Sequence, residues 1–94
     1  MTIQAVSPKH IVTYDGAVIN VFHANKGQGI PLHQHSYAHL TICHAGSCIV
    51  RKGQRELVMT KDTQPVNLLA DEGHEIEALE NGTVFVNVFA EGKY

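Results

Sequence analysis

The sequence predicts an all-β protein built from short antiparallel strands. Glycine and Asn/Asp turn signals recur at intervals of roughly 8–12 residues, which is typical of an antiparallel sandwich or barrel. The segments between these signals are rich in Val, Ile, Thr, Phe and Leu, and most of these residue types favour strands. No window keeps the apolar period of about 3.6 residues that marks an amphipathic helix. The predicted fold class is therefore a small antiparallel β-sandwich or barrel.

Eight segments are predicted as strands, and turn signals separate them. In chain order they are residues 10–14, 17–23, 38–44, 47–51, 55–59, 65–69, 74–79 and 83–89. Asp15-Gly16 lies between the first two and predicts a tight hairpin turn. Residues 24–32, rich in glycine and interrupted by Pro31, predict a long irregular loop, which is usually functional or flexible.

Length, composition and charge exclude several classes of function. Residues 1–94 make one predicted domain, and 44% hydrophobic with 17% charged residues excludes a disordered charged tail. A net charge of −2 argues against nucleic acid as the main partner. No apolar stretch approaches the roughly 20 residues of a membrane span, so no membrane partner is expected. The N-terminus shows no export signal, so we expect a cytoplasmic protein in which Cys43 and Cys48 are free, buried thiols.

Charged residues are unevenly placed along the chain. Five of the nine acids fall between Asp71 and Glu80, and four of the seven basic residues fall between Arg51 and Lys61. We interpret these clusters as two solvated strand faces.

Histidine is the unusual component, because its seven copies equal the Lys and Arg residues together. The tightest group is His33-x-His35-x3-His39, within a span that has no Asp or Glu. Residues two apart on a strand face the same way, so the first two imidazoles should project side by side, with His39 joining them after a bend. His74 is the only histidine in the second half of the chain. These four histidines are the predicted metal ligands, bound through neutral ring nitrogens.

The alternative is that histidines are ordinary surface or core residues. We interpret His10, His23 and His44 in that way, and His44 should face outward because it is out of phase with His39.

The spacing Gly27-x5-His33-x-His35-x3-His39-x6-Gly46 resembles the first motif of the cupin family, Gly-x5-His-x-His-x3,4-Glu-x6-Gly. Both glycines, both leading histidines and every interval agree, and His39 stands where the family usually has Glu. Of the second motif, Gly-x5-Pro-x-Gly-x2-His, only the histidine survives as His74. Thr63, Leu69 and Asp71 stand at the other motif positions.

The resemblance covers about residues 17–89 and implies a small jelly-roll cupin barrel with the metal inside. The implied cofactor is a divalent transition metal, such as Fe, Ni, Zn, Cu or Mn. Because His39 replaces Glu, the centre would be all-histidine and cationic, and it would attract a small anionic ligand. The resemblance also implies a homodimer, in which residues 2–12 are the segment expected to cross over.

Three functions remain open. The first is a metal-dependent enzyme acting on a small oxygen-rich molecule, as a dioxygenase of an enolisable compound or as a sugar-acid isomerase or lyase. No general base is evident, however. The others are a small-molecule-binding or sensing module and a purely structural metal site.

Several residues near the predicted ligands have open roles. Alternation places Thr41 and Cys43 toward the interior. Tyr37 could donate to a bound ligand or lie at the rim. In residues 83–89 both faces are apolar, so Asn87 could face inward or outward.

Overall fold

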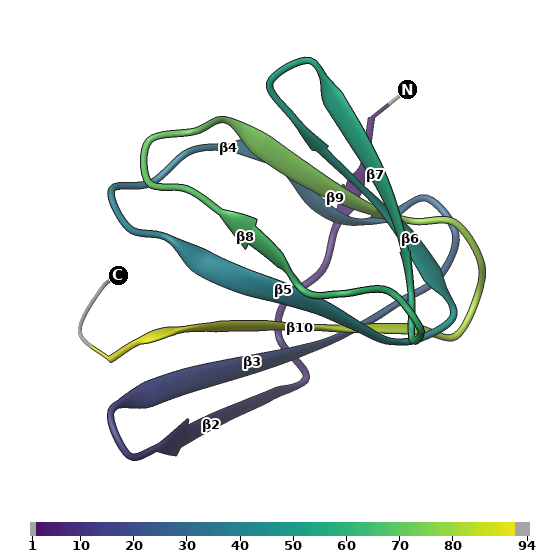
Figure 1. The fold of residues 1–94 in the computed structure, drawn as a ribbon. Coiled ribbons are helices and arrows are strands. Elements are labelled where there is room, and N and C mark those ends of the chain that lie inside the picture. Colours follow the sequence, from purple (N-terminus) through teal and green to yellow (C-terminus); the bar gives the residue numbers. More distant parts are fainter. Residues whose placement is uncertain (1, 92–94) are drawn as a thin grey trace.

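A computed structural model describes residues 2–91 and contains ten β-strands and no helix in that range (Figure 1). In chain order the strands are β1 (Gln4–Ala5), β2 (His10–Tyr14), β3 (Ala17–Ala24), β4 (Gln28–His33), β5 (His39–Ala45), β6 (Ser47–Lys52), β7 (Arg55–Thr60), β8 (Val66–Leu68), β9 (His74–Ala78) and β10 (Thr83–Ala90). The described residues therefore include no helix long and apolar enough to cross a membrane.

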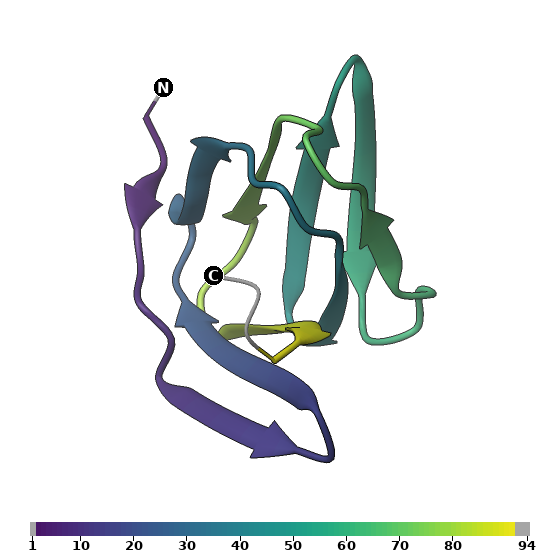
Figure 2. The same ribbon diagram turned by 90° about the vertical axis from the view of Figure 1, so that its left-hand side faces the viewer.

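The strands form two five-stranded sheets that face each other (Figures 1 and 2). The first sheet has the order β1-β4-β9-β6-β7, and the second has the order β2-β3-β10-β5-β8. Neighbouring strands are antiparallel, except that β1 is parallel to β4. The predicted all-β, antiparallel jelly-roll fold is confirmed.

The core lies between the sheets and is built by strict alternation. Along β10, the side chains Thr83, Phe85, Asn87 and Phe89 are buried, and the valines between them face outward. Phe85 stacks on Phe22 of β3 with ring centroids 4.9 Å apart. The sequence left open whether Asn87 faces inward or outward, and in the structure it faces inward.

The predicted loop over residues 24–32 is wrong, because β4 occupies most of it. Gly29 permits this strand, because any Cβ atom at this position would overlap the carbonyl oxygen of Ile76 in β9. Pro31 is tolerated because the pairing of β4 with β9 shifts register between Ile30 and His33. The sequence analysis also missed the two-residue strand β1.

Turn conformations agree with the predicted hairpins. Asp15 and Gly16 both have positive φ, at 48° and 84°, as a two-residue turn between twisted strands requires. Gly46, between β5 and β6, has a φ of 71° and leaves no room for a side chain beside Thr83.

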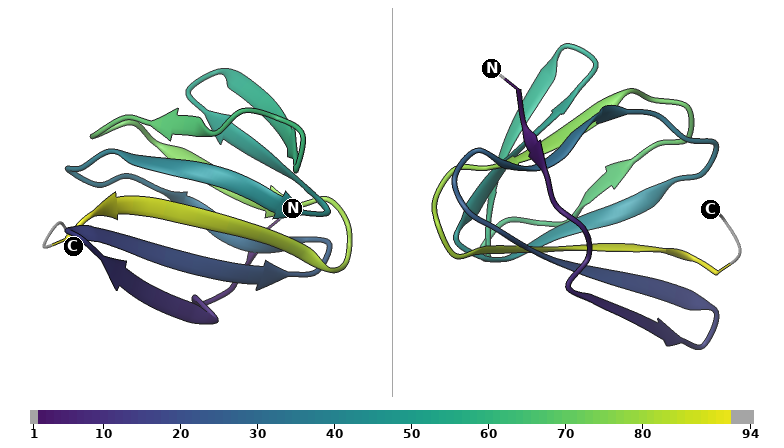
Figure 3. Two further views of the ribbon diagram at one scale, coloured as in Figure 1. Left: turned by 60° about the horizontal axis from the view of Figure 1, so that its bottom comes forward. Right: turned by 180° about the vertical axis from the view of Figure 1, so that it is seen from behind.

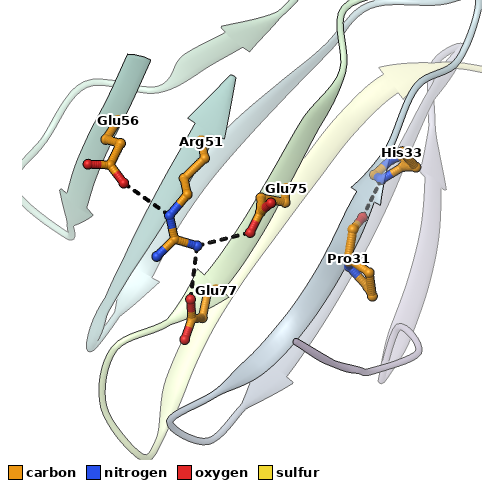
Figure 4. Close-up of polar contacts among 6 residues, drawn as sticks. All are labelled: Pro31, His33, Arg51, Glu56, Glu75 and Glu77. Atoms are coloured by element: carbon orange, nitrogen blue, oxygen red, sulfur yellow. Dashed lines mark hydrogen bonds and ion pairs between the residues drawn. The ribbon is translucent and has the colours of Figure 1, made fainter. Parts of the chain in front are cut away.

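The two charged clusters predicted as separate solvated faces meet on the outside of the first sheet. Arg51 of β6 pairs with Glu75 and Glu77 at 2.9 Å each and with Glu56 at 3.1 Å (Figure 4). The antiparallel register places Arg51 between Glu56 and Glu75.

Candidate metal centre

Four histidines meet at one end of the sandwich, where β4 ends and β5 and β9 begin. His33 ends β4, His39 begins β5, His74 begins β9, and His35 lies in the β4–β5 connection. The ring centroids are 4.4 Å apart for His33 and His74, 4.9 Å for His35 and His74, and 5.2 Å for His39 and His74. The candidate ligand atoms of His33, His35 and His74 all lie within 4.8 Å of one another.

The expected strand geometry for the first pair is only partly right. His35 lies beyond the end of β4, so strand alternation does not place it beside His33. The two rings nevertheless lie 5.2 Å apart, and the His35 and His39 rings lie 5.1 Å apart. The bend at residues 36–37 lies between His35 and His39 and brings these two rings together, as predicted for His39.

Backbone carbonyls fix the tautomer of three rings. His33 Nδ1 donates to the carbonyl oxygen of Pro31 at 2.8 Å (Figure 4), and His35 Nδ1 donates to that of Tyr37 at 2.6 Å. His74 Nδ1 donates to the carbonyl oxygen of Glu72 at 2.9 Å. A carbonyl can only accept, so each Nδ1 carries the proton and each Nε2 keeps a lone pair.

The fourth ring is oriented by a side chain. Thr41 Oγ1 donates to Asn87 Oδ1 at 2.7 Å and therefore uses its single hydrogen there. The 3.4 Å contact between Thr41 Oγ1 and His39 Nδ1 then has the imidazole as donor. His39 thus shares the tautomer of the other three, with its lone pair on Nε2. Thr41 faces inward, as alternation predicted.

The donor set fits a transition metal. His74 Nε2 is buried and has no hydrogen-bond partner in residues 2–91, which is costly for a polar atom with a lone pair. A divalent metal ion would satisfy it. Imidazoles whose other nitrogen is hydrogen-bonded are the usual protein ligands for such ions. His33, His35 and His74 could therefore hold one, and the His39 ring lies beside them, although its ligand atom is not among those within 4.8 Å of one another.

Burial keeps His39 and His74 neutral. The pKa of His39 falls to about 4, first because the ring is buried and then because His74 and His35 lie nearby. Burial, and next the neighbouring imidazoles of His33 and His35, likewise lower the pKa of His74, although the hydrogen bond to Glu72 opposes this. Metal ligation requires the neutral imidazole, so both shifts favour binding.

The site opens into a cavity of about 150 Å³. Its lining has no carboxylate and no Lys or Arg: Asn20, Phe22, Ile30, His33, His35, Tyr37, His39, Asn87 and Phe89. Tyr37 stacks on His35 with ring centroids 4.1 Å apart and lies 5.4 Å from Phe89, so it packs at the edge of the cavity. Sequence analysis missed Asn20. Its alternation with Val18 and Phe22 was the available signal.

The turn before His74 keeps its shape without the motif glycine. Asp71 stands at that glycine's position and has a φ of 64°, the left-handed region in which Asp is better tolerated than most residues. Its backbone nitrogen donates to the carbonyl oxygen of His35 at 2.6 Å. This bond ties the β8–β9 turn to the β4–β5 connection.

Replacement of Asp71 by glycine should raise the free energy of unfolding by about 0.5 kcal/mol, because glycine adopts this φ without strain. The gain is small since glycine also loses more entropy on folding. Urea unfolding of the two proteins measures it. A clear loss of stability would show that the aspartate side chain contributes more than its backbone strain costs.

The remaining histidines and both cysteines lie outside the site. His10, His23 and His44 are exposed, and the rings of the first two lie 6.3 Å apart. Cys43 and Cys48 are free and buried, as predicted. Burial raises the pKa of Cys43 and raises that of Cys48 to about 12, so both remain thiols rather than metal-binding thiolates.

Solved structures of other proteins share this fold, although no sequence match was found. The sequence matches no protein-family model and no curated protein. Solved structures do match. A cupin-2 domain protein of Shewanella frigidimarina aligns with a TM-score of 0.75 at 11% identity, covering 94% of this chain and 83% of its own. KdgF of a Halomonas species aligns with a TM-score of 0.72 at 19% identity, covering 86% and 74%.

A cupin superfamily protein of Desulfitobacterium hafniense aligns with a TM-score of 0.71 at 10% identity, over 90% of this chain and 81% of its own. These identities are low, but the alignments extend over most of every chain. Together with the histidine motif they lead to one conclusion: the chain has the cupin fold.

Proposed function

We propose that the protein binds one divalent transition metal through His33, His35, His39 and His74, and that it is a metal-dependent enzyme acting on a small oxygen-rich molecule. The observation that supports this is the cluster of four rings that share one tautomer, in which the candidate ligand atoms of His33, His35 and His74 lie within 4.8 Å of one another. A bound ion would act as a Lewis acid toward carbonyl or enolate oxygen. A dioxygenase and a sugar-acid isomerase or lyase are the reaction classes in keeping with that chemistry.

Metal content tests this proposal. Protein purified without added metal should carry about one transition-metal ion per chain, and His33→Ala and His74→Ala should lose most of it. His44→Ala is the matched control, because that side chain is exposed and outside the site. Wild-type content below about 0.2 ions per chain, even after incubation with each metal, would contradict the proposal.

A binding or sensing module is the second candidate. Among the described residues, the cavity lining contains no carboxylate that could act as a general base for proton transfer. Ligand-dependent stabilisation without turnover would favour this function. The two buried free thiols are compatible with the reducing cytoplasm, which is where we place the protein.

The charge of the centre supports an anionic ligand. Four neutral imidazoles leave a divalent ion uncompensated, whereas a glutamate at position 39, as in the family motif, would remove one charge. We expect His39→Glu to keep its metal and to bind propanoate several-fold more weakly, as measured by calorimetry. Gln54→Glu, which adds the same charge at an exposed position between β6 and β7 of the other sheet, should leave propanoate affinity unchanged. Equal affinity in all three proteins would argue against an anion at this site.

We also propose a homodimer formed through the outer face of the second sheet. In this sheet β10 lies between β3 and β5 (Figure 3). The face carries Val84, Val86 and Val88 of β10 at its centre, with further apolar residues of β3 and β5 beside them. In the described residues, the outward positions of β2, β3, β10 and β5 hold no Asp, Glu, Lys or Arg. Such a face can pair with a second copy without charge repulsion.

Light scattering after size exclusion tests the dimer. The wild-type chain should have twice the monomer mass, and Val86→Glu should be monomeric because it buries a charge at the centre of the face. Val58→Glu is the control, since Val58 is 58% exposed on β7 of the other sheet. A wild-type monomer at micromolar concentration would contradict the dimer.

A further inference from the structure

Two asparagines lie side by side on the cavity wall formed by the second sheet. Asn20 of β3 and Asn87 of β10 are direct partners in the antiparallel register. Both line the cavity that His33, His35 and His39 also line. Paired residues in such a register have neighbouring side chains on the same face of the sheet.

The two amides offer complementary hydrogen-bonding atoms. Asn87 Oδ1 already accepts from Thr41, and the Asn87 amide nitrogen makes no hydrogen bond within residues 2–91. Asn20 Oδ1 is buried and also lacks a partner there. The two neighbouring residues therefore hold one unpaired acceptor and one unpaired donor, and a rotation of the Asn20 amide would turn its buried Oδ1 toward the cavity.

A hydroxyl group satisfies both atoms, because it donates through its hydrogen and accepts through its oxygen. A carboxylate at this wall could satisfy only the Asn87 nitrogen, since it has no hydrogen to donate to Asn20 Oδ1. An apolar group would leave both amide atoms unpaired, at a cost for each. The wall thus selects for a hydroxyl.

Cavity size limits the rest of the ligand. A cavity of about 150 Å³ is comparable to one that holds benzene, so it accommodates roughly six non-hydrogen atoms. Its other lining groups, Phe22, Ile30 and Phe89, are apolar and suit a short carbon chain.

We infer that the cavity binds a small hydroxylated carboxylate of about six non-hydrogen atoms, with its carboxylate toward the histidines and its hydroxyl on Asn20 and Asn87. Asn20 and Asn87 are then the residues that determine specificity. This inference rests on the proposed metal centre, because the cation attracts the carboxylate end.

Calorimetry with two matched acids tests the inference. Metal-loaded wild-type protein should bind 3-hydroxypropanoate about five- to tenfold more tightly than propanoate, which lacks only the hydroxyl. Asn20→Leu removes the acceptor and should abolish this preference, whereas Asn20→Asp keeps an acceptor and should retain it while binding both acids more weakly. Asn67→Leu, on an exposed position of β8, is the control and should keep the wild-type preference.

Metal content measured on the same samples separates the possible failures. Metal-loaded wild-type protein that binds the two acids equally would overturn the inference and leave the metal centre intact. Retention of the wild-type preference by Asn20→Leu would also overturn the role of this residue. Wild-type protein that holds no metal would overturn the proposed function and the inference together.

Discussion

Replacement of Gly29 by alanine should lower the free energy of unfolding by at least about 3 kcal/mol, a large part of the stability of a small domain. The reason is the close approach of β4 and β9, in which an added Cβ would overlap the carbonyl oxygen of Ile76 and lie 2.9 Å from its carbonyl carbon. Both are backbone atoms, so no side-chain rotation relieves the clash. The two strands must separate, and His33 and His74 lie at the end of this pair.

Thermal unfolding measures the effect, and a drop in Tm of more than about 10 °C is expected. Gly73→Ala is the matched control, because a Cβ there would lie 3.8 Å from Leu32 Cδ1, an ordinary contact. We also expect Gly29→Ala to bind less metal, because displaced strands separate the ligands. Near-wild-type Tm and metal content for Gly29→Ala would show that β4 and β9 are not as close as described.

Acidification should destabilise the metal-free protein between pH about 6.5 and about 4. His39 has a pKa of about 4 in the folded protein, whereas the exposed group in the unfolded chain has its ordinary pKa of 6.5. Between these values the unfolded state binds more protons, so stability rises with pH. The stability linked to His39 is fully present above about 6.5 and is lost as pH falls through this window, on the order of 3 kcal/mol for this ring, which is only 6% exposed.

Urea unfolding of the chelated protein at a series of pH values gives this dependence. The lowered pKa of His74 acts in the same direction, so the total loss should exceed that from His39 alone. His39→Gln has no titrating group at this position and should show a shallower slope over the same range. A slope unchanged by this substitution would mean that His39 is not the buried neutral ring.

Much of the fold was predictable because its signals are local. The Asp15-Gly16 turn and the period-two alternation of β10 depend only on neighbouring residues, and both are confirmed. The strand β4 was not predictable in this way, since Gly29 and Pro31 usually interrupt strands. Only the tertiary contact explains them: β9 approaches so closely that glycine is required, and the proline coincides with a shift in register.

In the candidate site, too, some features were predictable from local sequence and others depend on tertiary contacts. The sequence predicted the four histidines, and the structure brings their rings together, although His35 reaches His33 through a connection rather than along a strand. In the turn before His74, Asp71 stands at the position of the motif glycine and has a positive φ, which few residues other than glycine adopt readily. Asn20 was missed because a polar residue in a strand is usually exposed. Its alternation with Val18 and Phe22 indicated the inward face, and the register with Asn87 places it on the cavity wall.

Each orienting bond of the histidine cluster spans only two residues along the chain: His33 to Pro31, His35 to Tyr37, His39 to Thr41 and His74 to Glu72. Ring direction and tautomer are therefore properties of short peptide segments, whereas the spacing between rings is a property of the two assembled sheets. A breathing motion that separates the sheets would change the distances between the lone pairs but leave each ring in its ligating form. Loss of the ion would thus be reversed by reclosing the sheets, without any tautomer exchange.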